Sequence, residues 1–372
     1  MFIIVLTAIL VLIHLYLWKR LVKDTTYRGP LRRALTAVLL GLAALLVAAL
    51  IVPRLTDTQE SAWLAWPGYL WFGLAAYLFL TLLVLEPVRL VLRRWTRRSP
   101  PPAPEPPETL ETPADPAVNR RIFLARAGAA AAGAASVGLA FNGFRIAVVS
   151  DVHLGPLAGR AHTERIVRMI NETEPDLVAI VGDLVDGTVA ELGAAAEPLQ
   201  DLVARDGAFF VTGNHEYFVP DTAEWLRELE RLDVHPLRNE NTDITRAGAR
   251  FTLAGVNDLA GEQRSDPPDF DRALAGRRDD APTVLLAHQP IQVGEAARRG
   301  VDLQLSGHTH GGQMWPFHYA VRAVQPALAG LSRVPGADDT QLYVTRGAGF
   351  WGPPIRIGAP PDITVLSLQN DG

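Results

Sequence analysis

The residues in this sequence best suited to chemistry are two histidines, His308 and His310, that stand one residue apart. They follow an apolar run, residues 301–305, that is typical of a strand, and glycines flank the pair on both sides. On an extended backbone, residues two apart point to the same side, so both imidazoles can reach one point just beyond the strand. Glycines let the backbone turn tightly there and leave room for a ligand. Alone, the pair is a modest indication of a metal site.

Four more clusters of polar side chains follow strand-like apolar runs upstream. They are Asp151-Val152-His153, Gly182-Asp183 with Asp186, Gly213-Asn214-His215-Glu216, and His288-Gln289-Pro290. Five of the nine histidines therefore lie just after predicted strands. In open α/β sheets, ligands bind beyond the carboxyl ends of the strands. Oxygen and imidazole ligands without sulfur suit divalent Mn, Fe or Zn, so we predict that these clusters converge on a metal site.

An α/β region must position these clusters. Buried strands are predicted at residues 144–150, 177–181, 208–212, 283–287 and 303–305, with further strands at 251–256, 342–345 and 363–368. Helices are predicted between some of them, at residues 163–172, 190–203, 222–232 and 291–299. From residue 144 onward roughly 225 residues remain, enough to bury a sizeable core.

Composition narrows the class of protein. The chain has 372 residues, which exceeds a typical single domain, and its first part is nearly all apolar between basic clusters. The net charge of −5 gives no reason to expect a nucleic-acid partner. The chain has no cysteine, which excludes disulfides and thiolate ligands but leaves the compartment open.

Three apolar runs near the N-terminus predict membrane spans, at residues 1–18, 34–53 and 61–85. Each is close to the ~20 residues that a hydrocarbon core needs. Six Lys and Arg residues lie between the first two runs, and five follow the third, whereas only Arg54 lies between the second and third. Basic loops stay in the cytoplasm, so we expect the N-terminus outside and the end of the third span inside.

A linker and a fourth apolar run follow. Residues 100–116 are rich in proline and glutamate and should form an extended, disordered linker. Arg120 and Arg121, followed by Phe-Leu and an Ala/Gly-rich run over residues 127–144, resemble a twin-arginine export signal. The alternative is an ordinary fourth span; cleavage near Ala135 also stays open. Both alternatives place everything after Phe144 outside the cytoplasm.

As a set, the clusters resemble the motifs of a known family. D-x-H, G-D, G-N-H-[DE], H and G-H-x-H, in this order, are the motifs of the metallophosphoesterases, or calcineurin-like phosphoesterases, and the resemblance covers residues 144–368. The membrane-associated bacterial branch, which includes exported phosphodiesterases related to lipid pyrophosphatases, looks most similar. Its G-D-L-V-D, G-N-H-E-Y and G-H-T-H-G-G-Q variants stand at residues 182–186, 213–217 and 307–313.

The resemblance implies a four-layer αββα sandwich with a dinuclear centre of Mn, Fe or Zn at the strand ends. It places one divalent ion on Asp151, His153 and His310, and a second on Asn214, His288 and His308, with Asp183 bridging both. Two dications that share a water acidify it enough to give hydroxide near neutral pH, which would attack phosphorus in line. His215 would then be catalytic, because by resemblance it lies over the phosphate and stabilises the transition state or protonates the leaving oxygen.

Other polar residues near the motifs carry weaker predictions. Asp186 is predicted to cap the following loop, with direct metal binding as the alternative, and Glu216 either to orient His215 or to be an exposed turn carboxylate. Surface or turn roles are expected for Arg160, His162, Asn257 and Asp258, with lining of the pocket as the alternative, and solvent-facing positions for His235 and His318. The G-x-G-x-x-G at residues 347–352 precedes two prolines where a helix should begin, so we reject a dinucleotide site. Arg346, Phe350 and Trp351 are candidates for a substrate rim.

These observations predict a membrane-anchored, metal-dependent phosphoesterase, multi-pass in the plasma (inner) membrane, with its catalytic domain outside the cytoplasm. We expect a transmembrane region at residues 1–98, a linker at 99–118, a signal or fourth span at 119–143 and a catalytic domain at 144–372. A phosphodiester or pyrophosphate, possibly lipid-linked or part of the envelope, is the expected substrate. The alternative is a membrane receptor or transporter whose metal-binding domain is regulatory. The substrate-binding residues and the oligomeric state stay open.

Overall fold

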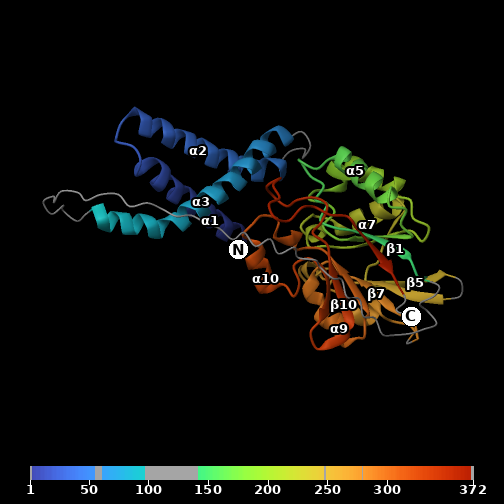
Figure 1. Ribbon diagram of the computed structural model, residues 1–372. Coiled ribbons are helices and arrows are strands. Elements are labelled where there is room, and N and C mark those ends of the chain that lie inside the picture. The colour runs from blue at the N-terminus through green and yellow to red at the C-terminus, as the bar shows by residue number, and fades with distance from the viewer. Residues whose placement is uncertain (1, 55–60, 97–140, 247–248, 279, 370–372) are drawn as a thin grey trace. The chain divides into compact units, whose positions relative to one another are not determined.

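The structure is a computed structural model that describes residues 2–54, 61–96, 141–246, 249–278 and 280–369 (Figure 1). The chain forms two compact units. One contains α1 (Phe2–Leu17), η1 (Trp18–Lys23) and the part of α3 (Ala62–Thr96) from Ala75 onward. The other contains α2 (Pro30–Ile51), η2 (Val52–Arg54), the first part of α3 and the whole α/β region.

Two of the described helices are long and apolar enough to cross a bilayer, namely α2 and residues Ala62–Pro87 of α3. The prediction of three or more spans is not supported for the first run. Its α-helix, α1, has 16 residues, which at 1.5 Å per residue covers about 24 Å, short of the ~30 Å hydrocarbon thickness. The linker, the twin-arginine-like segment and nearly all of the run at residues 127–144 lie outside the described residues.

Polar contacts join α1, η1 and the end of α3 within the first unit. The Tyr16 hydroxyl donates to Glu86 at 2.7 Å, and Arg20 pairs with the same carboxylate at 2.7 Å. Arg89 and Arg20 both pair with Asp24, at 2.6 and 2.9 Å. These charges lie at the ends of the apolar runs, where basic clusters were expected.

The α/β region contains two mixed sheets. The first has the order β11-β1-β2-β3-β4, in which β1 to β4 run parallel and β11 pairs antiparallel with β1. Its strands are β1 (Phe144–Val149), β2 (Leu177–Val181), β3 (Ala208–Val211), β4 (Val234–Pro236) and β11 (Thr364–Leu368). The connecting helices are α5 (Arg160–Asn171), α6 (Val189–Ala196), η3 (Glu197–Asp201), η4 (His215–Tyr217) and α7 (Thr222–Arg231).

The second sheet has the order β5-β6-β7-β8-β10-β9 and is parallel from β6 to β10. Its strands are β5 (Glu240–Arg246), β6 (Ala249–Gly255), β7 (Thr283–Leu286), β8 (Leu303–Ser306), β9 (Gly330–Val334) and β10 (Ala337–Val344). Its helices are η5 (Leu259–Arg264), α8 (Phe270–Ala273), η6 (Pro290–Gln292), α9 (Val293–Arg298), η7 (His310–Gly312) and α10 (His318–Val324).

Three apolar cores separate four layers. One core packs α5, α6 and α7, through side chains such as Ile170 and Trp225, against one face of the first sheet. A second lies between the two sheets and includes Phe144 and Phe251, whose rings meet edge to face at 5.5 Å. A third packs α8 and α9 against the second sheet. The observed layers are consistent with the predicted αββα arrangement.

The predicted strands are confirmed, most of them within one or two residues of their observed bounds, although β10 begins earlier than predicted. The sequence did not indicate β4, β5, β9, α8 or α10. The parallel strands β1, β2 and β3 of one sheet and β7 and β8 of the other all end in the predicted clusters. Because parallel strands end at the same edge of a sheet, this topology brings the clusters together.

Candidate metal centre

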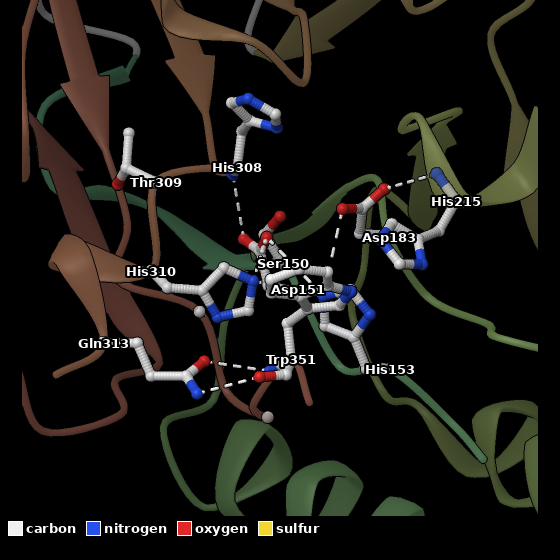
Figure 2. Close-up of polar contacts among 12 residues, drawn as sticks. Ser150, Asp151, His153, Asp183, His215, His308, Thr309, His310, Gln313 and Trp351 are labelled. Atoms are coloured by element: carbon white, nitrogen blue, oxygen red, sulfur yellow. Dashed lines mark hydrogen bonds and ion pairs between the residues drawn. The ribbon is translucent and has the colours of Figure 1, made fainter. Parts of the chain in front are cut away.

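The backbone bends sharply at the strand ends that carry the candidate metal ligands. Ten non-glycine residues in the described part of the chain have positive φ, and five of them are candidate ligands. These five are Asp151, His153, Asp183, His308 and His310, with φ between 50° and 71°. Such conformations cost energy for an L-residue, and they concentrate at functional sites where the surrounding structure holds them. Here they turn the side chains toward one another (Figure 2).

Asp151, His153 and His310 form the first group, and all three side chains are buried. Asp151 Oδ1 lies 3.1 Å from His310 Nε2 and 4.0 Å from His153 Nε2. The two Nε2 atoms are 3.1 Å apart. These are the three ligands that the family resemblance places on one ion.

Asp183, His288 and His308 form the second group. Asp183 Oδ2 lies 3.2 Å from His288 Nε2 and 3.8 Å from His153 Nε2, so this carboxylate stands between the two groups. Asn214 joins the second group because its Oδ1 lies 3.0 Å from His308 Nδ1. The structure thus brings together all seven residues that the sequence analysis named as metal ligands.

The buried donor atoms of these groups fit divalent cations. Asp151 Oδ1 and His288 Nε2 are fully buried, and the contacts described above join them only to other candidate ligands, among them His310 Nε2 and Asp183 Oδ2. The Nδ1 of His288 lies 2.8 Å from the carbonyl oxygen of Val181 and donates there, so Nε2 is the ring atom that faces Asp183. Within each group the ligand atoms lie within 4.8 Å of one another. Buried charges of this kind need a partner, and oxygen with imidazole donors suits Mn, Fe or Zn.

The pKa values of the buried groups are strongly perturbed. Burial raises the pKa of Asp151, but the charges of His310 and His288 outweigh it and hold that pKa well below its usual value. His288 and His215 do the same for the pKa of Asp183. Burial lowers the pKa of His308 to about 4. Asp151 and Asp183 are therefore anionic at neutral pH, and His308 is a neutral imidazole able to bind a cation.

Two glycines give the ligands room. A Cβ on Gly182, which has φ +83°, would come within 2.7 Å of His288 Nδ1. A Cβ on Gly307 would come within 2.5 Å of Asp151 Oδ2. The glycines of the G-D and G-H motifs are thus required by close packing around the ligands, not by flexibility alone.

His215 lies beside the candidate ligands without belonging to the two ligand groups above. Its backbone N–H donates to Asp183 Oδ1 at 2.9 Å, and its ring lies edge to face with His153, with 4.5 Å between centroids. Its Nδ1 lies 2.7 Å from Asp186 Oδ1. Burial lowers the pKa of His215, but the Asp186 and Asp183 carboxylates overcome this and raise it to about 9.

The prediction that Asp186 caps a loop is wrong. Its Oδ1 lies 2.7 Å from the ring of His215 and 2.9 Å from Nδ1 of His153. One carboxylate oxygen therefore orients a candidate ligand and the candidate catalytic histidine together. Sequence spacing gave no sign of this, because the two histidines lie 33 residues before and 29 residues after Asp186.

Glu216 neither orients His215 nor is exposed, so both alternatives for it are wrong. The side chain is buried, and its oxygens accept backbone N–H groups of Asp183, Leu184, Val185 and Gly213 at 2.6 to 3.2 Å. Burial and the Asp183 carboxylate raise its pKa to about 7. Glu216 joins the loop after β2 to the loop after β3.

Replacing Glu216 with glutamine is expected to destabilise the protein by about 2–4 kcal/mol, because the amide would turn an N–H₂ group toward backbone donors and leave some of them unpaired. Thermal unfolding of the purified chain measures this. The exposed Glu230, replaced in the same way, should change stability by less than about 0.5 kcal/mol. Equal melting temperatures for the two variants would contradict this role for Glu216.

The weaker predictions had mixed outcomes. Arg160 is on the surface, paired with Glu164 and Glu197, and His235 is exposed, as expected. Asn257 and Asp258 are fully buried, not on the surface, but Asp258 has a turn role because its carboxylate accepts from the Ala260 backbone N–H at the start of η5. Gln289 also donates to the Asp258 carboxylate, at 3.0 Å. His162 and His318 are half-buried rather than facing solvent.

The sequence analysis assigned no role to two further residues near the candidate metal centre, Arg356 and Gln313. Arg356 donates to the backbone carbonyls of Gly349 and Arg346 at 2.8 and 3.0 Å, and it lies 3.2 Å from His310 Nδ1. Gln313 holds the backbone of Trp351. The sequence could have indicated Gln313, because it is the last residue of the G-H-T-H-G-G-Q motif. Arg356 matches no motif, so nothing in the sequence indicated it.

Comparison with known proteins agrees with this geometry. The sequence profile of the calcineurin-like phosphoesterase family matches residues 144–312. A metallophosphoesterase of Aquifex aeolicus is 32% identical over 231 residues, which are 61% of this chain and 86% of that protein. The chain belongs to the calcineurin-like phosphoesterase family. Bacillus subtilis YkuE, also named a metallophosphoesterase, is 30% identical over 234 residues, 62% of this chain and 80% of YkuE.

One longer relative is named a transmembrane protein. The "transmembrane protein with metallophosphoesterase domain" of Bos taurus is 43% identical over 239 residues, which are 61% of this metallophosphoesterase. The aligned part is only 53% of the bovine protein, so the chain spans about half the length of that relative.

Proposed function

We propose that this metallophosphoesterase hydrolyses phosphoesters with two bound divalent ions, and that its substrate is a phosphodiester or pyrophosphate. The observation that carries the proposal is the convergence of the seven candidate ligands beside a histidine that is not one of them. Asp183 Oδ2 stands within 4 Å of a histidine of each group, which supports a bridging role. His215 lies next to this bridge, where a bound phosphate would lie.

Each residue then has a definite part. Asp151, His153 and His310 would hold one ion and Asn214, His288 and His308 the other, with the Asp183 carboxylate available to both. The ions, when bound, would neutralise charge on the phosphoryl oxygens. They would also lower the pKa of bound water, so that hydroxide is available near neutral pH. Mn, Fe and Zn all suit this donor set.

His215 supplies the proton. Its Nδ1 faces Asp186, so Nε2 is the atom that can reach a substrate. The two nearby carboxylates favour the protonated ring, as the raised pKa shows. A protonated imidazole donates to the leaving oxygen as the ester bond breaks, which avoids release of a strongly basic alkoxide.

Replacing Asp186 with asparagine is expected to lower kcat by about 10- to 100-fold, because the carboxylate orients both His153 and His215. The substitution removes a charge that raises the pKa of His215. The loss of kcat at alkaline pH should therefore begin at lower pH than in the wild type. A pH–rate profile of the two proteins measures this, and an unchanged alkaline limb would exclude Asp186 as the partner of His215.

Membrane anchoring rests on separate observations. Two described helices are long and apolar enough to span a bilayer, and a relative is named a transmembrane protein. We infer a multi-pass anchor in the plasma (inner) membrane at residues 1–98, a linker at 99–118, a twin-arginine-like or spanning segment at 119–143, and a catalytic domain from residue 144 outside the cytoplasm. Tethering would confine the enzyme to lipid- or envelope-linked phosphoesters.

The proposed reaction is tested with the full chain, purified in detergent and loaded with Mn²⁺. It should cleave bis(4-nitrophenyl) phosphate, a generic diester, faster than 4-nitrophenyl phosphate, the corresponding monoester. Faster cleavage of the monoester would contradict the diester assignment. A metal-loaded but inert protein would instead favour the alternative in which the domain is a regulatory part of a receptor or transporter.

A further inference from the structure

Two exposed aromatic rings lie beside the candidate proton donor. Phe218 follows His215 on the same turn, and its backbone N–H donates to the His215 carbonyl at 2.9 Å. The Phe218 ring lies 5.0 Å from the His215 ring, and the Trp351 ring lies 6.5 Å from it. Phe218 is 66% exposed and Trp351 47% exposed. Rings of this size on a monomer surface next to a reactive group indicate a contact with a ligand.

Trp351 is held in place by Gln313. The Gln313 side chain accepts from the Trp351 backbone N–H at 2.9 Å and donates to the Trp351 carbonyl at 2.9 Å (Figure 2). The same amide donates to the Pro353 carbonyl at 3.1 Å. Gln313 itself follows the η7 turn that carries His310. The backbone of Trp351 is thus held against the segment that carries a candidate metal ligand.

Two more exposed apolar side chains, Trp315 and Ile357, lie on segments that are hydrogen-bonded to one another and to Gln313. The backbone of Trp315 donates to Ile357 at 2.8 Å, and Ile357 donates to Gln313 at 2.9 Å, so the two loops lie side by side. Trp315 and Ile357 are also exposed. The surface next to His215 therefore offers apolar contacts over more than one side chain.

We propose that Phe218 and Trp351 form the subsite for the leaving group, and that this group is apolar. The inference rests on the proposed function, because it places the leaving oxygen next to His215. Whatever is bonded to that oxygen must then lie over the neighbours of His215. A leaving phosphate, as in pyrophosphate cleavage, would need cations to pair with, whereas these two side chains offer aromatic surface. The subsite thus favours a phosphodiester whose leaving alcohol carries a ring or an alkyl chain.

The test measures binding, so it does not depend on turnover. Methyl, n-butyl and benzyl phosphate share the phosphate that the ions would bind and differ only in apolar surface. Each is titrated by calorimetry into the Mn²⁺-loaded full chain. Butyl or benzyl phosphate is expected to bind about tenfold more tightly than methyl phosphate, since each fully buried methylene contributes roughly a factor of four. A preference for butyl alone indicates a chain-bearing leaving group, and one for benzyl alone a ring-bearing group.

Substitutions of Phe218 and Trp351 test whether these two side chains cause the preference for apolar phosphates. The double substitution Phe218→Ser with Trp351→Ser should bring the three affinities within about twofold of one another, with affinity for methyl phosphate unchanged. The control, Val203→Ser with Leu331→Ser, removes two other exposed apolar side chains and should keep the wild-type preference. Equal affinities in the wild type, or a preference that survives Phe218→Ser with Trp351→Ser, would overturn the subsite. Failure of all three phosphates to bind would instead contradict the proposed metal centre.

Discussion

Replacing His215 with asparagine is expected to lower kcat by roughly 10²- to 10⁴-fold, the range typical for loss of a general acid. Asparagine is uncharged at all relevant pH values and has no proton to give to a leaving alkoxide. His215 contacts Asp183 through its backbone, and Asp186 still holds the neighbouring ligand His153 through Nδ1 when the His215 ring is replaced, so we expect the candidate ligands to stay in place. Metal content, measured by mass spectrometry of the purified variant, should therefore equal that of the wild type.

His235→Asn is the matched control for this experiment. His235 is exposed on β4, at the edge of the first sheet, and belongs to none of the candidate ligand groups among the described residues. The control should keep wild-type turnover. If His215→Asn kept full activity, or lost its metal, the proton-donor role would be wrong.

Replacing Asp183 with asparagine should have the largest effect of all, a loss of about 10³-fold or more in kcat together with a loss of bound metal. The carboxylate is buried and stands between the two histidine groups, 3.2 Å from His288 and 3.8 Å from His153. An amide of the same shape removes the negative charge that two adjacent cations would share. Turnover and metal content are measured on the same preparation.

Asp271→Asn is the control for charge. The Asp271 side chain is 87% exposed and pairs with Arg299 on the surface. Its loss should leave turnover and metal content unchanged. An Asp183→Asn variant that bound metal as fully as the wild type would exclude the bridging role.

The strands and the candidate ligands could be predicted from the sequence because both signals are local. A short apolar run such as residues 177–181 indicates a buried strand, and the polar residue that follows, Asp183, marks its end. The topology then brings these polar residues together, because parallel strands end at the same edge of a sheet. The motifs, through the family resemblance that they carry, were enough to name seven candidate ligands that the structure brings together.

The errors involve burial and long-range contacts, which periodicity does not report. Glu216 is an acidic residue in a turn, and only the fold shows that four backbone N–H groups surround it. Asp186 and Gln313 act on residues 29 to 38 positions away. Edge strands such as β5, whose sequence Glu-Asn-Thr-Asp-Ile-Thr-Arg is mostly polar, have no apolar run to reveal them.

The first membrane run shows a different error. Apolar composition over residues 1–18 was counted as a span, but composition does not show where an α-helix ends. The π-helical segment η1, which carries Lys19, Arg20 and Lys23, begins at Trp18, so α1 ends at 16 residues.

The central proposal is that two ions share the Asp183 carboxylate, and a crystal of the Mn²⁺-loaded protein tests it most directly. An anomalous difference map recorded with X-rays above the manganese absorption edge should show two peaks about 3.5–4 Å apart, one beside Asp151, His153 and His310 and the other beside Asn214, His288 and His308. Asp183 should touch both peaks. A single peak, or two peaks without Asp183 between them, would contradict the proposed centre.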